Sequence, residues 1–267
     1  MNEYENQLTH EEIQKLAEHL ENAELQKLEV TKITDDYPHM TWQDAYDIQW
    51  AIRARKRANN HKIIGMKMGL TSAAKMQQMG VDSPTYGFLA DYFAIESGAD
   101  IEIDALIHPK IESEIAFVTH TDLKGPNVDV ADVLAATEYV VPAVEIIDSR
   151  YKDFKFDLKS VVADHSSSVR FIRGKQKIAL DKIDLKTLEV ILSINDTEIE
   201  RGTGAAVMGD PAISVAKLAN MLAERNEILP AGSFVMTGGM TAAASVAKGD
   251  RMSVVYQGVE TVTAQFV

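Results

Sequence analysis

The hydrophobic pattern of the chain changes near His61, and this change constrains the fold more than any other feature of the sequence. Before His61, apolar residues recur at the spacing of three and four residues that is typical of amphipathic helices. After it, runs rich in valine and isoleucine are short and are separated by glycine, proline and aspartate, as strands and turns are. We therefore expect an α+β (mixed α/β) protein, with a small helical N-terminal lobe over residues 1–60 and a larger domain over residues 61–267.

The N-terminal lobe contains two predicted helices. Thr9 and Glu12 have the spacing of a capping box, and the apolar residues that follow predict a helix over residues 9–25. The same period starts again at Thr41 and ends in a basic run that finishes with two asparagines, which predicts a second helix.

The larger domain mixes strands and helices. Strands are expected at residues 63–68, 115–119, 139–147, 168–172, 188–194 and 233–237, and as a hairpin over residues 251–266. Helices are expected at residues 72–79, 130–136 and 213–225. No repeat or long linker divides these elements.

The composition narrows the class of protein. Of the 267 residues, 46% are hydrophobic and none is cysteine, which excludes disulfides and thiolate metal sites. No apolar run approaches the roughly 20 residues that cross a bilayer, and the first residues lack the pattern of a signal peptide. The net charge of −13 disfavours nucleic acid as a partner, although a metal ion and a lysine can still attract a small anionic substrate. We expect a cytoplasmic protein that binds neither membranes nor nucleic acid.

Two glutamates alternate in the segment HPKIESEIAFV, residues 108–118. In a strand, Glu112 and Glu114 would present both carboxylates on one face, while the apolar and serine side chains between them point to the other. Carboxylates so placed repel each other unless a cation or a shared proton joins them, and Mg²⁺ or Mn²⁺ prefers such oxygen ligands. The alternative is a half-exposed strand with a solvated glutamate face.

A third glutamate, Glu145, lies inside the apolar, β-branched run YVVPAVEIID, residues 139–148. Because a lone charge is costly to bury, Glu145 should be paired, protonated or bound to a metal ion. A salt bridge to Arg150, or a surface position at a sheet edge, stays open as an alternative. Three glutamates from two strands would match the acid set of a Mg²⁺ or Mn²⁺ enzyme.

Three further segments combine polar groups with apolar or glycine-rich surroundings. In GMKMGLTS, Lys67 has the pattern either of a partly desolvated cation that meets an anionic substrate or of a snorkelling surface lysine. VADHSSSVR gathers Asp164, His165 and three serines before a strand, as a capped turn or as a group that holds a carboxylate. MTGGMTAA supplies Thr237 and two glycines whose backbone amides can bind an oxyanion.

Taken together and in order, these segments resemble the fumarylacetoacetate-hydrolase superfamily, in its branch of hydratases and decarboxylases from the catechol meta-cleavage pathway. The resemblance covers nearly the whole chain and rests on GMKMGLTS, YGFLADYF, HPKIESEIAF, VVPAVEIIDSRYKDFKFDL, VVADHSSS, GAAVMGDPAISVAKLAN and PAGSFVMTGGMTAA. It implies a mixed β-sheet roll or barrel over residues 61–267 as the catalytic domain. It also implies a homo-oligomer, and a complex between decarboxylase and hydratase.

The resemblance also implies roles for individual residues. The ligands of Mg²⁺ or Mn²⁺ would be Glu112, Glu114 and Glu145. Catalytic roles fall on Lys67, Ser167 and Asp164, and substrate contacts on Thr237, Gly238 and Leu89. The serine-rich loop departs from the common Asp-Asn-Ala-Ser order through His165 and Ser166, which leaves its detailed role open.

The turn Pro84-Thr85-Tyr86-Gly87 bears on the reaction. Hydratases of this branch carry an acidic residue where Thr85 stands, and without that carboxylate the addition of water loses an acid–base group. The resemblance thus implies metal-dependent decarboxylation of the oxo-dicarboxylate 2-oxo-3-hexenedioate to 2-hydroxypenta-2,4-dienoate and CO₂. Tyr86, Phe88 and Leu89 are expected to wall the less polar end of the pocket, where the carboxylate leaves.

Other functions stay open as alternatives. The nearest is hydration of 2-hydroxypenta-2,4-dienoate. An acylpyruvate hydrolase would need a water-activating His-Glu pair near the N-terminus, which the sequence lacks. A catalytically silent partner of a hydratase would not need the three glutamates and Lys67.

Overall fold

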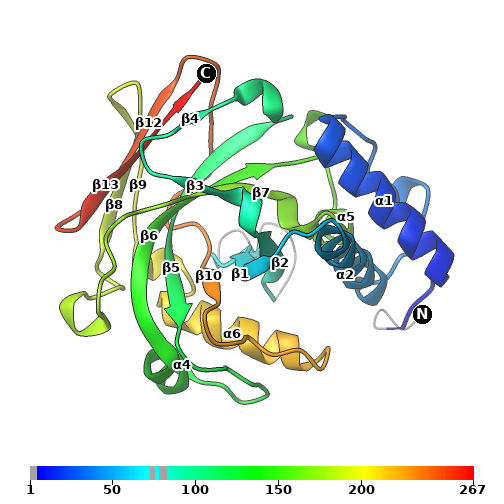
Figure 1. The fold of residues 1–267 in the computed structure, drawn as a ribbon, viewed down its shortest axis with the longest axis horizontal. Coiled ribbons are helices and arrows are strands. Elements are labelled where there is room, and N and C mark those ends of the chain that lie inside the picture. The colour runs from blue at the N-terminus through cyan, green and yellow to red at the C-terminus, as the bar shows by residue number, and fades with distance from the viewer. Residues whose placement is uncertain (1–4, 73–75, 78–82) are drawn as a thin grey trace.

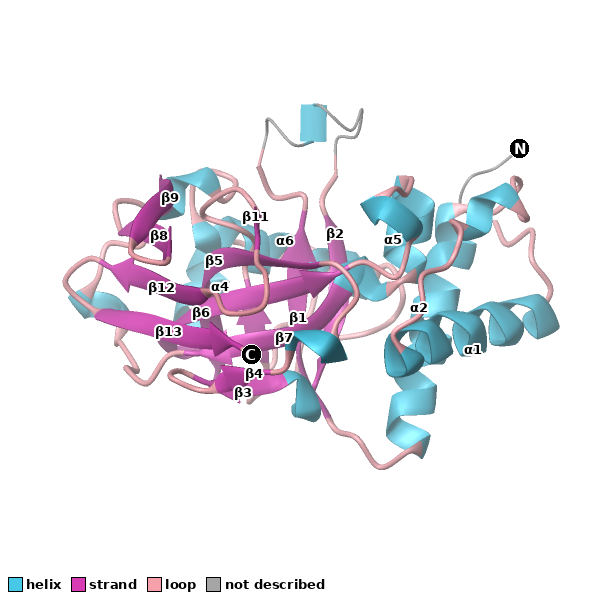
Figure 2. Ribbon diagram, turned by 90° about the horizontal axis from the view of Figure 1, so that it is seen from above, coloured by secondary structure: helices cyan, strands magenta, loops and turns pink. Residues whose placement is uncertain are grey.

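Two mixed sheets and a group of helices make up the structure, a computed structural model that describes residues 5–72, 76–77 and 83–267 (Figure 1, Figure 2). The helices are α1 (His10–Gln26), α2 (Trp42–Ala58), α4 (Val130–Ala136), α5 (Leu158–Ala163) and α6 (Pro211–Ala223). The strands are β1 (Ile63–Gly69), β2 (Thr85–Ala90), β3 (Ala94–Glu96), β4 (Asp100–Ile101), β5 (Pro109–Thr119), β6 (Thr137–Asp148), β7 (Ser168–Arg173), β8 (Glu189–Ile194), β9 (Thr197–Thr203), β10 (Phe234–Met236), β11 (Ala244–Ser245), β12 (Arg251–Tyr256) and β13 (Glu260–Phe266).

The strand pairings confirm the mixed α/β class. The larger sheet has the order β2-β1-β10-β5-β6-β7-β3, with β11 paired to the start of β5, and the smaller sheet has the order β4-β13-β12-β8-β9. In Figure 1 the smaller sheet lies at the upper left, across the larger sheet from α1 and α2. The expected roll or barrel is corrected to two separate sheets, because within the described residues the edge strands of neither sheet pair with each other.

Helices α1 and α2 form the predicted helical segment at the N-terminus. Each begins at a capping box, in which the hydroxyl of Thr9 or Thr41 accepts a hydrogen bond from the backbone three residues later. The helices pack against each other, and their buried side chains belong to the same hydrophobic cluster as those of the larger sheet. Division of the chain into two domains at residue 60 therefore stays a prediction.

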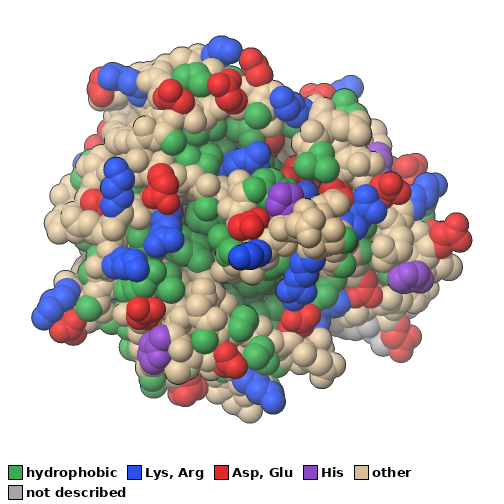
Figure 3. Space-filling view, viewed as in Figure 1, with side chains coloured by type: hydrophobic (Ala, Val, Ile, Leu, Met, Phe, Trp, Pro, Cys, Tyr) green, Lys and Arg blue, Asp and Glu red, His purple; other side chains and the backbone are tan. Residues whose placement is uncertain are grey.

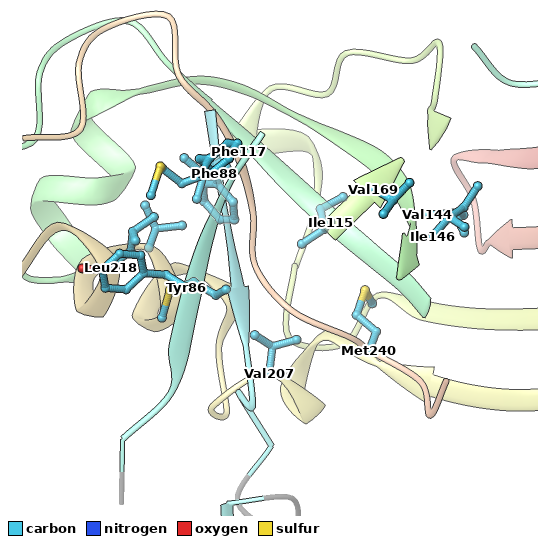
Figure 4. Close-up of a cluster of buried hydrophobic side chains, with 14 of the residues drawn as sticks. Tyr86, Phe88, Ile115, Phe117, Val144, Ile146, Val169, Val207, Leu218 and Met240 are labelled. Atoms are coloured by element: carbon cyan, nitrogen blue, oxygen red, sulfur yellow. The ribbon is translucent and has the colours of Figure 1, made fainter. Parts of the chain in front are cut away.

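The two faces of the larger sheet differ in what they bury. On β5, Ile115 and Phe117 point toward α6 and join the main hydrophobic cluster, in which Leu218 of α6 also takes part (Figure 4). The alternate residues of β5 point to the opposite face, where Ala116 packs with Phe171 of β7 in a second, smaller cluster. The same face carries the glutamates of β5, because side chains two apart share a face.

Most predicted elements are confirmed within a few residues. Strand β5 begins at Pro109, six residues earlier than expected, so it includes both glutamates of the Glu-x-Glu segment. Strand β2 was not predicted because its residues are all buried and show no alternation. Helix α5 was also missed because it is short. The predicted helix over residues 72–79 lies mostly outside the described residues.

The molecular surface carries charges of both signs. On the face shown in Figure 3, basic and acidic side chains are interspersed around hydrophobic atoms. Across residues 5–72, 76–77 and 83–267, no helix is long and apolar enough to span a membrane.

Candidate metal centre and substrate pocket

Three glutamates lie together on one face of the larger sheet. Glu112 and Glu145 are directly opposite each other in the antiparallel pair of β5 and β6, and Glu114 follows two residues along β5. One carboxylate oxygen of each lies within 4.8 Å of the others. Since like charges opposite each other destabilise a sheet, this arrangement calls for a positive partner.

Burial makes the charge of these carboxylates expensive. Glu114 and Glu145 are almost fully buried, whereas Glu112 is half-buried. Burial raises the pKa of Glu114 well above its usual range, and the neighbouring Glu145 and Glu112 raise it further. Burial also raises the pKa of Glu145, against the opposing effect of Lys67.

The cluster fits a divalent cation. Within the described part of the chain, Oε1 of Glu114 is buried without a hydrogen-bond partner, and Oε1 of Glu145 is buried with only the ion pair to Lys67. Buried polar atoms are normally satisfied, so an unpaired carboxylate oxygen within an acidic cluster is unusual. Mg²⁺ prefers hard oxygen ligands of this kind and would remove the repulsion among them. This donor set contains no nitrogen or sulfur, which argues against a softer metal.

Lys67 is a buried cation beside the glutamates. Its Nζ lies 3.3 Å from Oε2 of Glu145, to which it donates a hydrogen bond, and 3.2 Å from Oε1. Only 3% of Lys67 is exposed, so it is not a snorkelling surface lysine. Gly65 permits the close approach of β1 to β10, because a Cβ there would lie 1.8 Å from the carbonyl oxygen of Phe234.

Lys67 and Glu112 border a pocket of about 230 Å³. Its size suits a small organic acid, because drug-sized ligands occupy larger cavities of roughly 300–1,000 Å³. Its polar lining comes from Lys67, Thr85, Lys110, Glu112, Ser166 and Ser167. The apolar lining comes from Ile147, Phe154, Phe156, Leu158 and Val161. The pocket thus combines charged and hydroxyl groups with an aromatic wall.

A strained turn brings two serines to the pocket. His165, Ser166 and Ser167 have φ angles of 36°, 59° and 57°, in the left-handed region that non-glycine residues seldom occupy. The fully buried Arg150 holds the turn from behind. Its Nη2 lies 2.8 Å from Nε2 of His165 and donates a hydrogen bond to the carbonyl of Ser168 at 3.0 Å.

Asp164 lies behind this turn, where it pairs with Arg150 at 2.9 Å. Burial raises the pKa of Asp164 to about 7, although the Arg150 charge opposes the shift. Its other oxygen accepts a hydrogen bond from the Ser167 hydroxyl at 3.4 Å. Asp164 can therefore act on a ligand only through Ser167, and the predicted catalytic roles of both residues stay predictions.

Thr237 and Gly238 support the metal centre from behind. The Thr237 hydroxyl donates a hydrogen bond to the carbonyl of Ile115 at 2.9 Å, and the Gly238 amide donates to Oε2 of Glu114 at 2.7 Å. Gly238 has a φ of 104°, and a Cβ there would lie 2.1 Å from the Thr71 hydroxyl. Both residues thus position β5 and Glu114 in this structure, and their predicted substrate contacts stay predictions.

The residues expected to wall the apolar end lie elsewhere. Leu89 is fully buried in the second hydrophobic cluster, on the glutamate face of the sheet. Tyr86 and Phe88 point to the opposite face (Figure 4), where Tyr86 stacks on Tyr46 and Phe88 on His165. This was not predicted because β2 was not recognised as a strand. Within β2, Thr85, Gly87 and Leu89 share the face of Lys67, and the residues between them point to the other face.

Several pocket residues were not predicted from the sequence. Phe154 and Phe156 form the aromatic wall, and Lys110 lies beside them. Their signal is present in the sequence as KDFKF after the Glu145 strand and as a lysine two residues before Glu112. Period-two spacing on β5 would have placed Lys110 on the glutamate face.

Comparison with known proteins gives close relatives of full length. The 4-oxalocrotonate decarboxylase of Pseudomonas sp. strain CF600 is 57% identical over 260 residues, which cover 97% of this chain and 98% of the relative. The 2-hydroxyhexa-2,4-dienoate hydratase of Comamonas testosteroni is 39% identical over 88% of this chain and 89% of the relative. No family model matches the chain.

The solved structures agree with the sequence comparison. The 4-oxalocrotonate decarboxylase from Pseudomonas putida G7, complexed with magnesium and adipate, has a TM-score of 0.97 at 56% identity and covers 98% of this chain and 100% of its own. A putative fumarylacetoacetate hydrolase family protein from Yersinia pestis, at 16% identity and a TM-score of 0.58, and the fumarylpyruvate hydrolase from Pseudomonas aeruginosa, at 13% and 0.60, share the fold. The chain therefore belongs to the 4-oxalocrotonate decarboxylase family, whose more distant relatives include hydratases.

Proposed function

We propose that the protein decarboxylates 2-oxo-3-hexenedioate (4-oxalocrotonate) to 2-hydroxypenta-2,4-dienoate and CO₂, as a carboxy-lyase of catechol meta-cleavage. The observation that carries this proposal is the cluster of Glu112, Glu114 and Glu145, in which a buried Glu114 oxygen has no hydrogen-bond partner and Glu112 borders a pocket of small-acid size. A relative of 56% identity is complexed with magnesium and a six-carbon dicarboxylate, which supports Mg²⁺ as the ion, with Mn²⁺ as the alternative. The three glutamates are the proposed ligands.

A divalent ion held by these carboxylates would supply Lewis-acid stabilisation for the negative charge that reaches the substrate's ketone oxygen. When C6 leaves as CO₂, the electron pair of the broken C5–C6 bond moves through the C3–C4 double bond to that oxygen, which takes up a proton to give the 2-hydroxy dienoate. The Lys67 ammonium, oriented by Glu145, adds positive charge at the same end of the pocket and can give up a proton there. Ser167 lines this end, and its hydroxyl would turn from Asp164 to donate a hydrogen bond to the substrate carboxylate.

The apolar wall suits the end that loses its charge. Phe154, Phe156 and Val161 exclude water from the departing carboxylate, which favours the neutral product CO₂. Thr85 lines the pocket with a hydroxyl where a hydratase of this branch carries an acid. This difference favours decarboxylation. Hydration stays the alternative reaction, because hydratases are also relatives of this chain, at lower identity.

Turnover of 2-oxo-3-hexenedioate with Mg²⁺ or Mn²⁺ tests the proposal, through CO₂ release and the ultraviolet absorbance of the dienoate. Activity should vanish on thorough chelation and return with either metal. Full activity after chelation would refute metal dependence. Hydration of added 2-hydroxypenta-2,4-dienoate without release of CO₂ would establish the hydratase instead.

The proposal also covers the setting of the enzyme. We propose a cytoplasmic homo-oligomer that associates with the pathway hydratase. The absence of cysteine from all 267 residues suits a reducing compartment. Size-exclusion chromatography with light scattering, alone and mixed with the hydratase, measures both associations.

A further inference from the structure

Lys110 brings a second lysine to the pocket, and the mechanism above does not use it. Lys110 precedes Glu112 by two residues on β5, so its side chain lies on the face that carries Glu112 and Glu114. It lines the same pocket as Lys67 and Glu112. Its Nζ lies 4.0 Å from the centroid of the Phe154 ring, which holds the ammonium at the aromatic wall by a cation–π contact.

Lys110 and Lys67 differ in whether a carboxylate neutralises the ammonium group. The Lys67 ammonium is neutralised by Glu145, at 3.2 Å. Lys110 is half-buried and has no ion-pair partner among the residues that the structure describes. A cation at an apolar wall without a counterion attracts an anion that enters the pocket, because the low local dielectric strengthens the interaction.

The spacing along β5 matches the length of a six-carbon dicarboxylate. Side chains two apart on a strand are separated by roughly 6.5–7 Å. Six carbons are joined by five bonds of about 1.5 Å, and the zigzag of an extended chain shortens the span between the terminal carbons to about 6 Å. An acid whose first carboxylate lies at Glu112 therefore brings its second to the level of Lys110 and of Ile147, the residue opposite Lys110 on β6.

We propose that Lys110 determines specificity by binding the second carboxylate of the substrate, the one that leaves as CO₂, and so selects dicarboxylic over monocarboxylic acids. The identity of the substrate rests on the proposed function. A lysine that binds this carboxylate about equally in the ground state and in the transition state changes KM and not kcat. The aromatic wall beside Lys110 keeps the same carboxylate poorly hydrated.

Calorimetric titration of the Mg²⁺-loaded protein with adipate, which has two carboxylates, and with hexanoate, which has one, measures how much the second carboxylate contributes to affinity. Neither acid is turned over. In Lys110→Met, adipate should bind about 10- to 100-fold more weakly, the range for a lost charge-assisted hydrogen bond, while hexanoate binds within twofold of the wild type. The KM for 2-oxo-3-hexenedioate should rise by the same factor with kcat within threefold. Lys110→Arg should keep most of the preference for adipate.

Lys155→Met is the matched control, because Lys155 lies next to Phe154 in the sequence, is 81% exposed and carries the same charge. It should leave both affinities unchanged. Equal weakening of adipate and hexanoate in Lys110→Met, or weakening of neither, overturns the inference, and so does a fall in kcat that matches the fall in kcat/KM. Lys110→Gln replaces the methionine variant if that variant does not fold.

These outcomes are distinct from failure of the proposed function. If the wild type prefers adipate through Lys110 but releases no CO₂, the specificity role stands and the decarboxylase assignment falls. If the wild type releases CO₂ while Lys110→Met still prefers adipate by the wild-type factor, the assignment stands and the role of Lys110 falls.

Discussion

At the scale of single residues, Glu114 is the ligand whose loss should be easiest to interpret. Its carboxylate is fully buried, and Oε2 accepts a hydrogen bond from the Gly238 amide, which a glutamine oxygen can also accept. We expect Glu114→Gln to reduce kcat/KM at least about 1,000-fold, since metal stabilisation of the developing charge amounts to several kcal/mol. The dienoate absorbance measures this loss.

The fold should survive this substitution, because glutamine removes a buried charge that Glu145 and Glu112 repel. The melting temperature of metal-free Glu114→Gln should be no lower than that of the wild type. Glu138→Gln, at an exposed position on β6, is the control and should keep full activity. Activity of Glu114→Gln within tenfold of the wild type would rule out Glu114 as a ligand.

A second residue-scale prediction concerns His165 in the strained turn. Burial, together with the Arg150 charge, lowers the pKa of His165 to about 3. The ring therefore stays neutral in the folded protein at a pH where the unfolded chain, with a pKa near 6.5, takes up a proton. The charged groups around it are Glu24 of α1, Lys56 of α2, Arg150 and Asp164.

The sign of the effect follows from proton linkage. Below pH 6.5 the unfolded chain binds a proton at His165 that the folded protein does not bind. The free energy of unfolding is therefore unaffected by protonation of His165 above that pH and decreases as the pH falls from 6.5 toward 3. Between pH 8 and pH 5 the loss should be about 2 kcal/mol. His165→Gln, whose amide oxygen can replace Nε2 opposite Arg150, should lack this part of the pH dependence in urea unfolding. Identical pH profiles for both proteins would contradict the prediction.

At the scale of elements, a buried ionic network joins the N-terminal helices to the site. Lys56 of α2 pairs with Glu24 of α1 at 2.8 Å and with Glu21 at 3.5 Å, and Glu24 lies 3.6 Å from Arg150, which holds the serine turn. All four side chains are at most 5% exposed. Removal of Lys56 takes a cation from two buried carboxylates, so that Glu21 keeps Arg55 and Glu24 keeps Arg150 as its ion-pair partner. Loss of one partner from a buried network is more costly than replacement of the whole network.

Lys56→Met should therefore destabilise the protein by about 3–5 kcal/mol, the range for one lost partner of a buried pair. For a chain of this length that corresponds to a melting temperature lower by roughly 6–20 °C. Lys15→Met, at an exposed position on α1, should change it by less than about 2 °C. A loss below about 1 kcal/mol in Lys56→Met would show that the network does not hold the helices in place.

How far the sequence predicts the elements depends on whether their pattern is local. Capping at Thr9 and Thr41 and the alternation around Glu112 are local signals, and they placed α1, α2 and the glutamate face correctly. Pairing of β5 with β6, which sets Glu112 opposite Glu145, depends on register between distant segments and has no local signal. A pair between Arg150 and Glu145 was left open as an alternative, and the structure pairs Arg150 with Asp164 instead.

At the scale of the whole molecule, metal binding should couple to folding. The unfolded chain has no preformed set of three carboxylates, so an ion that binds Glu112, Glu114 and Glu145 stabilises only the folded state. At a Mg²⁺ concentration 100 times the Kd, mass action contributes about 2.7 kcal/mol. This should raise the melting temperature by roughly 5–10 °C for a chain of this length.

Differential scanning calorimetry of chelated protein, titrated with Mg²⁺ or Mn²⁺, measures this coupling without any substrate. The wild type should gain stability with each metal, and the increase should follow the logarithm of the metal concentration above the Kd. Glu114→Gln should gain less than about 2 °C under the same conditions, because one ligand is lost while the fold is kept. Equal shifts in both proteins would place the stabilising ion elsewhere, since general ionic effects do not depend on Glu114.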